Sequence, residues 1–530
     1  MKVVGNLVDL EIGSIYPAEV EINNKVISSI KKLNKRVKGY ILPGLVDAHI
    51  HIESSLLPPV EFARIASVFG TVATVSDPHE IANVLGLKGV EFMINSSKKR
   101  EFKTLFGASP CVPATPFESS GAKLGVEEIK EILQMDRVGF LSEVMNFPAV
   151  IQKDKEILAK IELAKKMNLP IDGHCPNLRG DDLTKYIEAG ITTDHESSSL
   201  DEAIEKIKKG MKILIREGSA AKNFEALHPL IKDYPKKVMF CSDDLHPNDL
   251  IKGHINLLVK RALELGYELF DVLRVASINP IEHYNLDVGR LREGDRADFI
   301  VVDNLDDFNI LKTVINGKVV AKNGKSTLEF LASPLINNFS VKQKSLEYIK
   351  TPECKKVRVI EVIDGELITN SLILDSKSDD LLKIVVVNRY EDKPVKGIGF
   401  IKGFGLREGA IASSVAHDSH NIVAVGCSDE EIIEAINKII SSKGGICAIS
   451  KDKTKHLPLP IAGLMSPLEA QEVALKYEEI DSFAKELGAV LKAPFMSLSF
   501  MALLVIPSLK LSDKGLFDSE EFKFVSFCAN

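Results

Sequence analysis

Eight apolar, β-rich runs follow one another through the middle of the chain, and stretches with helical periodicity separate several of them. Lys155–Met167 places apolar residues on one helical stripe, and Leu200–Ile207 and Leu250–Leu265 resemble it. Eight strands, most of them followed by a helix, predict an α/β fold of the (β/α)8 TIM-type barrel over residues 43–284. A doubly wound sheet is the alternative, but no glycine-rich phosphate turn follows the first strand. The runs span residues 44–50, 71–76, 103–109, 138–144, 170–173, 191–193, 211–215 and 237–241.

The segments on either side of this region consist of short β stretches and lack the alternation of strands and helices. The first forty residues and the runs Gly289–Asn304 and Thr313–Lys325 are short β stretches, and Asn316-Gly317 is a hairpin turn signal. We therefore expect a composite β-sandwich domain built from residues 1–42 and 285–340. The rest of the chain, 341–530, is predicted to be an α+β domain, with strands at 356–363, 367–374 and 382–388 and helices at 430–441 and 467–487.

Composition excludes several classes of protein. The 67 basic residues are outnumbered by 74 acidic ones, for a formal charge of −7, which argues against a nucleic-acid partner. The most apolar stretch, Phe495–Leu509, is too short to span a bilayer, and the acidic start Met1–Gly13 is not a signal peptide. Seven cysteines without a C-x-x-C pair do not form a disulfide framework. We therefore expect a cytoplasmic protein with no membrane partner.

Histidines and carboxylates cluster where the predicted strands end, which is the catalytic end of such a barrel. His49 and His51 lie two apart on a strand, so both point to one face and can bind one ion. His174 and His195 follow neighbouring strands and can bind a second. The strand ends carry His49 and His51, then His79-Glu80, Glu143, His174, His195-Glu196, Arg216-Glu217 and Asp243-Asp244.

These positions predict a binuclear metal centre. Glu143 lies between the two histidine pairs in strand order and can bridge both ions, while Asp243 completes the ring next to the first strand. Four imidazoles and two carboxylates suit Zn, Mn or Fe rather than Ca or Mg. Two such ions would make a shared hydroxide nucleophilic at neutral pH, which predicts metal-assisted hydrolysis. A single H-x-H pair on a strand, or one buried histidine, would by itself more often be structural.

The stretch PGLVDAHIHIESS at residues 43–55, with the later strand-end histidines and Asp243, resembles the amidohydrolase superfamily. More narrowly, the chain resembles the bacterial and archaeal adenine deaminases almost from end to end. The stretches that carry this resemblance are SDPHEIANVLG (76–86), SEVMNF (142–147), DGHCP (172–176), TDHES (193–197), REGSAAKN (216–223), CSDDLHP (241–247) and VAHDSHNIVAVG (415–426).

The resemblance implies hydrolysis of adenine to hypoxanthine and ammonia, with two divalent ions per chain, Mn2+ or Fe2+ favoured and Zn2+ possible. It implies that His49, His51 and Asp243 hold one ion, that His174 and His195 hold the other, and that Glu143 bridges them. Asp243 would accept a proton from the hydroxide and pass it to the leaving amine.

Further residues are candidates for substrate contact or support, and each has a plainer interpretation. Glu217 either hydrogen-bonds the purine edge or forms an ion pair with a nearby basic residue. Asp244 either orients a metal ligand or caps the following helix. The C-terminal loop with His417 and His420 either closes over the barrel mouth or is a solvated surface loop. The remaining candidates for these supporting roles are His79, Glu80 and Ser219.

Two other functions compete with deamination. Another amidohydrolase reaction, such as ring opening of a cyclic amide, would use the same centre but release no ammonia. A non-catalytic binding protein of the same fold would have lost metal ligands, whereas all six positions are filled here. We also expect a homo-oligomer, with the apolar run 495–509 in either the core or a subunit interface.

Overall fold

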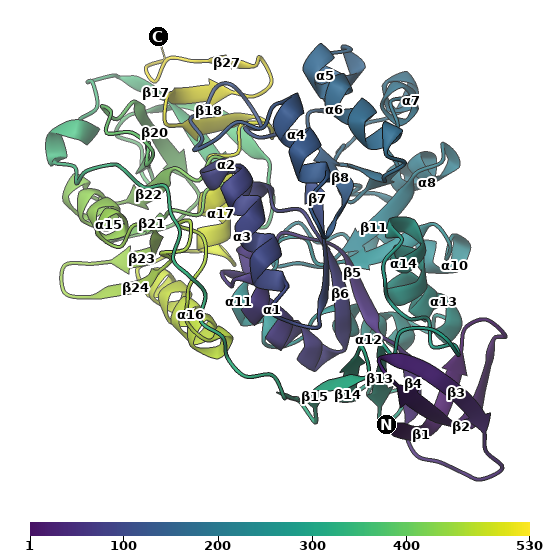
Figure 1. Cartoon of the computed structure of the whole chain (residues 1–530). Coiled ribbons are helices and arrows are strands. Elements are labelled where there is room, and N and C mark those ends of the chain that lie inside the picture. The colour runs from purple at the N-terminus through teal and green to yellow at the C-terminus, as the bar shows by residue number, and fades with distance from the viewer. Residues whose placement is uncertain (530) are drawn as a thin grey trace.

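The computed structural model, which describes residues 1–529, has eight parallel strands at its centre (Figure 1). They form two sheets, with strand orders β5-β6-β7-β8-β9 and β10-β11-β12. Each strand overlaps one of the predicted runs, so the predicted α/β alternation is confirmed. The bounds are β5 Leu45–Ile50, β6 Thr71–Ser76, β7 Lys103–Ala108, β8 Val138–Val144, β9 Ile171–Gly173, β10 Thr193–Asp194, β11 Lys212–Arg216 and β12 Val238–Cys241.

Backbone hydrogen bonds join the two sheets at both edges. The N–H of Thr192 donates to the carbonyl of Ile171 at 2.8 Å, and the N–H of Asp243 donates to the carbonyl of His49 at 2.9 Å. The expected barrel is therefore seen in part, as two joined sheets rather than one continuous ladder. Strands β9 and β10 have only three and two residues, too few to pair regularly with each other.

Helices connect most of these strands. The predicted helices at 155–167 and 200–207 are confirmed, but the one expected to begin at Leu250 begins at Ile255. His254 turns inward there, and its ring bonds Asp47 and Thr71. The bounds are α1 Pro59–Ala66, α2 His79–Leu85, α3 Leu87–Ser97, α4 Val126–Leu133, α5 Phe147–Ile151, α6 Lys155–Lys166, α7 Gly180–Glu188, α8 Leu200–Lys208, α9 Phe224–Leu227, α10 Leu230–Asp233, α11 Pro247–Leu250, α12 Ile255–Glu264, α13 Leu269–Leu273 and α14 Asn279–Tyr284.

The segments that flank the central strands in sequence share one eight-stranded sheet, at the lower right of Figure 1. Its order is β16-β15-β14-β13-β4-β1-β2-β3, so β4 and β13 join the two halves. The predicted hairpin turn is present, with Asn316 and Gly317 at φ 49° and 74°. The bounds are β1 Lys2–Asp9, β2 Ser14–Asn23, β3 Val26–Lys32, β4 Tyr40–Pro43, β13 Phe299–Val302, β14 Ile310–Ile315, β15 Lys318–Lys322 and β16 Lys325–Ser326.

The C-terminal part is α+β, as predicted. It contains an eight-stranded sheet of order β18-β17-β20-β19-β22-β21-β23-β24 and a small sheet β25-β26-β27. The bounds are β17 Lys356–Val362, β18 Thr369–Asp375, β19 Leu382–Val387, β20 Gly397–Lys402, β21 Ala410–Ser413, β22 Ile422–Gly426, α15 Asp429–Ser441, β23 Gly445–Ile449, β24 Thr454–Pro458, α16 Ala470–Glu486, α17 Pro494–Phe500, β25 Leu509–Ser512, β26 Gly515–Asp518 and β27 Lys523–Phe524.

The C-terminal part packs directly on the central strands and their helices. One apolar core cluster contains residues of both, including Leu56 and Ile461. The run 495–509 belongs to this core, since Phe495 and Leu498 are buried, and it is therefore not an exposed interface. Helix α17, yellow in Figure 1, packs against β21 and β22 of the C-terminal sheet.

Cys354 and Cys528 form a disulfide across 174 residues, a pairing that the sequence spacing did not predict.

Within residues 1–529, no helix combines the length and apolar character needed to cross a bilayer.

Candidate metal centre and active site

Asp243, His49 and His51 meet where the first and last central strands join. The Nε2 atoms of His51 and His49 lie 3.2 and 3.5 Å from Oδ1 of Asp243. All three side chains are nearly inaccessible to solvent. Asp243 has φ 57°, a left-handed conformation that is uncommon for non-glycine residues but more accessible to aspartate than to most.

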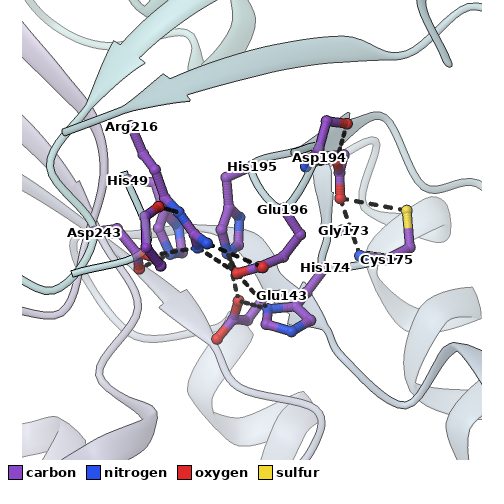
Figure 2. A network of polar contacts seen from close by, with 12 residues as sticks. His49, Glu143, Gly173, His174, Cys175, Asp194, His195, Glu196, Arg216 and Asp243 are labelled. Carbon is purple, nitrogen blue, oxygen red and sulfur yellow. Dashed lines mark hydrogen bonds and ion pairs between the residues drawn. The ribbon is translucent and has the colours of Figure 1, made fainter. Parts of the chain in front are cut away.

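A second group forms around Glu143 at the end of β8 (Figure 2). Its Oε2 lies 3.0 Å from Nδ1 of His174 and 3.1 Å from Nε2 of His195. Its other oxygen, Oε1, lies 3.7 Å from Nε2 of His51, in the first group. Glu143 therefore stands between the two groups, as the strand order suggested.

The charges of these groups are strongly coupled. Burial alone would raise the pKa of Glu143, yet the His174 and His195 imidazoles hold it well below its usual value. Burial likewise opposes ionisation of Asp243, and the nearby Arg216 cation outweighs it and holds that pKa well below the ordinary value. Burial also opposes protonation of His174, but Glu196 and Glu143 raise its pKa to about 9. Both carboxylates are thus anionic at neutral pH.

The residues fit a divalent metal centre on chemical grounds. The Nε2 atoms of His49 and His51 face each other at 3.2 Å, a gap in which only one of them can carry a hydrogen. Nδ1 of His49 is buried and has no hydrogen-bond partner. Buried imidazole nitrogens and carboxylate oxygens that converge in this way suit a bound cation of the Zn, Mn or Fe type. The sets that could each hold an ion include His49, His195 and Asp243, and also Glu143, His174 and His195.

Arg216 is a member of the site whose role the sequence did not reveal. Its Nη1 donates to Oδ2 of Asp243 at 2.7 Å, and the guanidinium forms a two-pronged contact with Glu196. Figure 2 shows it reaching across from the Asp243 side to the Glu196 side. It therefore shares one positive charge between two carboxylates and leaves Oδ1 of Asp243 facing the histidines.

His79 and Glu80 begin helix α2 and extend the cluster. Nδ1 of His79 lies 3.2 Å from both Oδ2 of Asp77 and Oε1 of Glu143. Glu80 is buried beside it, and burial opposes its ionisation. The imidazoles of His417, His420 and His79 outweigh that effect and hold the pKa of Glu80 well below its usual value.

The C-terminal loop reaches this cluster, so the interpretation of it as a solvated loop is wrong. Nδ1 of His417 contacts one oxygen of Glu80, and Nε2 of His420 contacts the other. Both rings are buried, and His417 is 4.0 Å from Asp244. The two histidines therefore hold a carboxylate of the central region from across the interface with the C-terminal part.

The other predicted supporting residues lie in different places. Asp244 borders the cavity and accepts a 2.5 Å hydrogen bond from Ser54, and it does not cap helix α11, whose N-cap is His246. Ser219 lies outside the cavity lining, and its hydroxyl donates to Asp249.

Glu217, a candidate for either a purine-edge contact or an ion pair, does not line the cavity beside the metal-ligand cluster. Its carboxylate lies 3.3 Å from both Lys222 and Arg261, and it lines a separate cavity behind the strand ends. The ion-pair interpretation is the one that the structure shows. Residues alternate faces along β11: Leu214 packs inside with the other strands, so Arg216 faces inward and Glu217 faces outward.

The cavity above these groups is closed on one side by the C-terminal part. Its charged lining comes from the strand ends and from α2, together with His417 and Asp418. Its apolar lining includes Met145 and Ala220 from the central region. The C-terminal part supplies four further apolar side chains, Leu367, Phe500, Leu503 and Val505.

Parallel strands that end in buried imidazoles and carboxylates are the architecture of a hydrolytic metalloenzyme. The model for the amidohydrolase family matches residues 40–320, and the model for the adenine deaminase C-terminal domain matches residues 358–523. The adenine deaminase of Sulfurovum sp. (strain NBC37-1) is 57% identical over 533 residues, covering 100% of each chain. The adenine deaminase of Methanosarcina mazei is 50% identical over 553 residues, again covering 100% of each.

Among solved structures, a β-aspartyl dipeptidase of Fervidobacterium islandicum is 18% identical with a TM-score of 0.47, covering 62% of this chain and 100% of that one. The full-length relatives settle the family: the chain belongs to the amidohydrolases and, within them, to the adenine deaminases.

Proposed function

We propose that this protein hydrolyses adenine to hypoxanthine and ammonia. The observation that carries the proposal is the buried cluster of four histidines, Glu143 and Asp243 at the strand ends, in a chain 57% identical to an adenine deaminase over its full length. In this reaction water adds to the ring carbon that bears the amino group, and the amino group leaves as ammonia.

The proposed centre holds two divalent ions, Mn2+ or Fe2+ favoured and Zn2+ possible. His49, His51 and Asp243 would hold one, His174 and His195 the other, and Glu143 would bridge them. When bound, such ions lower the pKa of water so that hydroxide is available at neutral pH. The position of Glu143, within 3.7 Å of His51 and 3.1 Å of His195, supports the bridging role.

We assign proton transfer to Asp243. Arg216 occupies its Oδ2, so Oδ1 is the oxygen that can accept a proton from the attacking water. The same carboxyl group can then donate that proton to the departing amine, acting first as base and then as acid. Since Arg216 keeps the pKa of Asp243 low, the base form is present at neutral pH.

We assign recognition of the purine edge to Glu80, with His79, Asp244 and His417 around it, in place of Glu217. The Glu80 carboxylate lines the cavity and is held by two histidines of the C-terminal loop. A fixed carboxylate can hydrogen-bond an N–H of the purine ring. Closure of the cavity by the same loop would keep bulk water away from the bound base.

The domain organisation is proposed on the same basis. We propose a (β/α)8 barrel over 43–284, a β-sandwich from 1–42 and 285–340, and a C-terminal domain over 341–530. The hydrogen bonds that join the two central sheets at both edges support the barrel. Assembly into a homo-oligomer and a cytoplasmic location stay predictions.

The test is ammonia release from adenine by protein purified without chelator and supplied with Mn2+, with adenosine run alongside. We expect equal amounts of ammonia and hypoxanthine from adenine. Glu143→Gln should lose metal, measured by plasma mass spectrometry, and reduce the rate by at least about a thousandfold. A native protein that holds two ions but releases no ammonia would refute adenine as substrate and direct the search to ring opening of cyclic amides.

A further inference from the structure

A lysine without a counter-ion is buried behind the apolar wall of the cavity. Lys510 lies in the middle of strand β25, and its side chain is fully inaccessible to solvent. Among residues 1–529, no carboxylate forms an ion pair with it within 4.0 Å. Burial alone lowers its pKa to about 7, which means that placing a charged amine there is unfavourable.

The amine of Lys510 is bonded to the backbone of two wall residues. Nζ donates to the carbonyl of Leu367 at 2.6 Å and to the carbonyl of Phe500 at 3.1 Å. Leu367 and Phe500 both line the catalytic cavity, although they lie 133 positions apart in the sequence. Lys510 itself does not line the cavity, so it can act on substrate only through these two residues.

Other hydrogen bonds around Lys510 hold the neighbours of the two wall residues, and the carbonyl of Phe500 also accepts from the N–H of Leu503. The carbonyl of Pro507 accepts from the N–H of Thr369, and the N–H of Leu511 donates to the carbonyl of Met501. Without the amine, the Leu367 carbonyl would lose its buried donor and the Phe500 carbonyl would keep only the Leu503 N–H, which destabilises their present position. The direct link between Leu367 and Phe500 through Nζ would then be lost, and the two residues could shift by a small amount relative to each other.

We propose that Lys510 is a positioning residue that fixes the Leu367–Phe500 wall and thereby sets the affinity for the substrate base. This inference rests on the proposed function, because it concerns the same cavity. The wall is apolar and lines the same cavity as the metal-ligand cluster but has no ligand atom of its own, so it would contact the flat face or the edge of a purine and not the reacting atoms. Its displacement therefore weakens binding much more than it slows the chemical step.

The test compares Lys510→Met with Lys514→Met in the metal-loaded full chain. Methionine is one atom shorter than lysine, keeps an unbranched apolar stem and cannot donate. Lys514 is a matched control because its Nζ also donates to two backbone carbonyls, those of Pro116 and Glu118, neither of which belongs to a residue that lines the catalytic cavity. We expect Lys510→Met to raise the KM for adenine about tenfold with kcat within about threefold of native, and Lys514→Met to change neither.

Lys510→Gln provides the second arm if the methionine variant fails to fold. Its amide is uncharged and can still donate, but it is one atom shorter and cannot reach both carbonyls, so we expect a KM between those of the native and methionine proteins. A native KM in either folded, metal-loaded variant would overturn the proposal, as would an equal rise in Lys514→Met. Absence of ammonia release by the native protein would refute the proposed function instead.

Discussion

Lys206 is fully buried between two carboxylates beside the metal-ligand histidines, and its loss should weaken both the fold and the centre. Its Nζ lies 2.9 Å from Oδ2 of Asp194 and 2.7 Å from Oε1 of Glu202. Asp194 in turn accepts the N–H of Cys175 at 3.0 Å, and Cys175 directly follows His174. Asp194 also precedes His195 in the chain, so one lysine supports the positions of two predicted ligands.

Replacement by methionine keeps an unbranched apolar stem, one atom shorter than that of lysine, and removes the charge. Two carboxylates with no solvent access then lose their shared counter-ion, and breaking a buried pair in this way costs about 3–5 kcal/mol. For a unit the size of the central region, such a loss lowers the melting temperature by about 10 °C. Because Asp194 positions the backbone beside both histidines, metal affinity should fall by about 10- to 100-fold.

Differential scanning calorimetry and a metal titration of the apoprotein measure these two effects. Lys208→Met is the matched control, since Lys208 lies on the same helix α8 but is exposed. Adding Asp194→Asn to Lys206→Met should recover part of the lost stability, because one unpaired charge is removed. Equal melting temperatures for Lys206→Met and Lys208→Met would refute the reasoning.

Three further predictions concern the cavity and the C-terminal part. Arg216→Met should raise the pKa of Asp243, because the cation that lowers it is lost, so the acid limb of kcat/KM should move to higher pH; an unmoved limb would contradict this. His420→Phe should leave two metal ions bound but lower kcat/KM at least about tenfold, since Glu80 loses a partner. His456→Phe, in the same part of the chain, should change neither the metal content nor kcat/KM. Lys510 has a pKa of about 7 when folded and about 10.4 when unfolded, so the unfolded chain binds more protons between these values. The stability of the native protein relative to Lys510→Met should therefore rise between pH 7 and pH 10, and urea unfolding that gives the same difference at pH 6 and pH 9 would exclude it.

The strand-end ligands could be predicted from sequence because their geometry is local. Side chains two apart on a strand share a face, which places His49 and His51 together, and parallel strands bring their carboxyl ends to one side of a sheet. The same rule could not choose between Arg216 and Glu217. The residues before them, Ile213, Leu214 and Ile215, are all apolar because both faces of the strand are buried. The sequence pattern therefore does not indicate which face of the strand points inward.

The sequence by itself determined the alternation of strands and helices, the residue types at the strand ends and the class of chemistry they allow, since each depends on short-range periodicity. Only the tertiary structure decided which C-terminal residues complete the site. His420 meets Glu80 across 340 positions, and Lys510 joins Leu367 to Phe500. Such contacts depend on how two sheets that are far apart in the sequence pack through a common core, and no spacing along the chain indicates that arrangement.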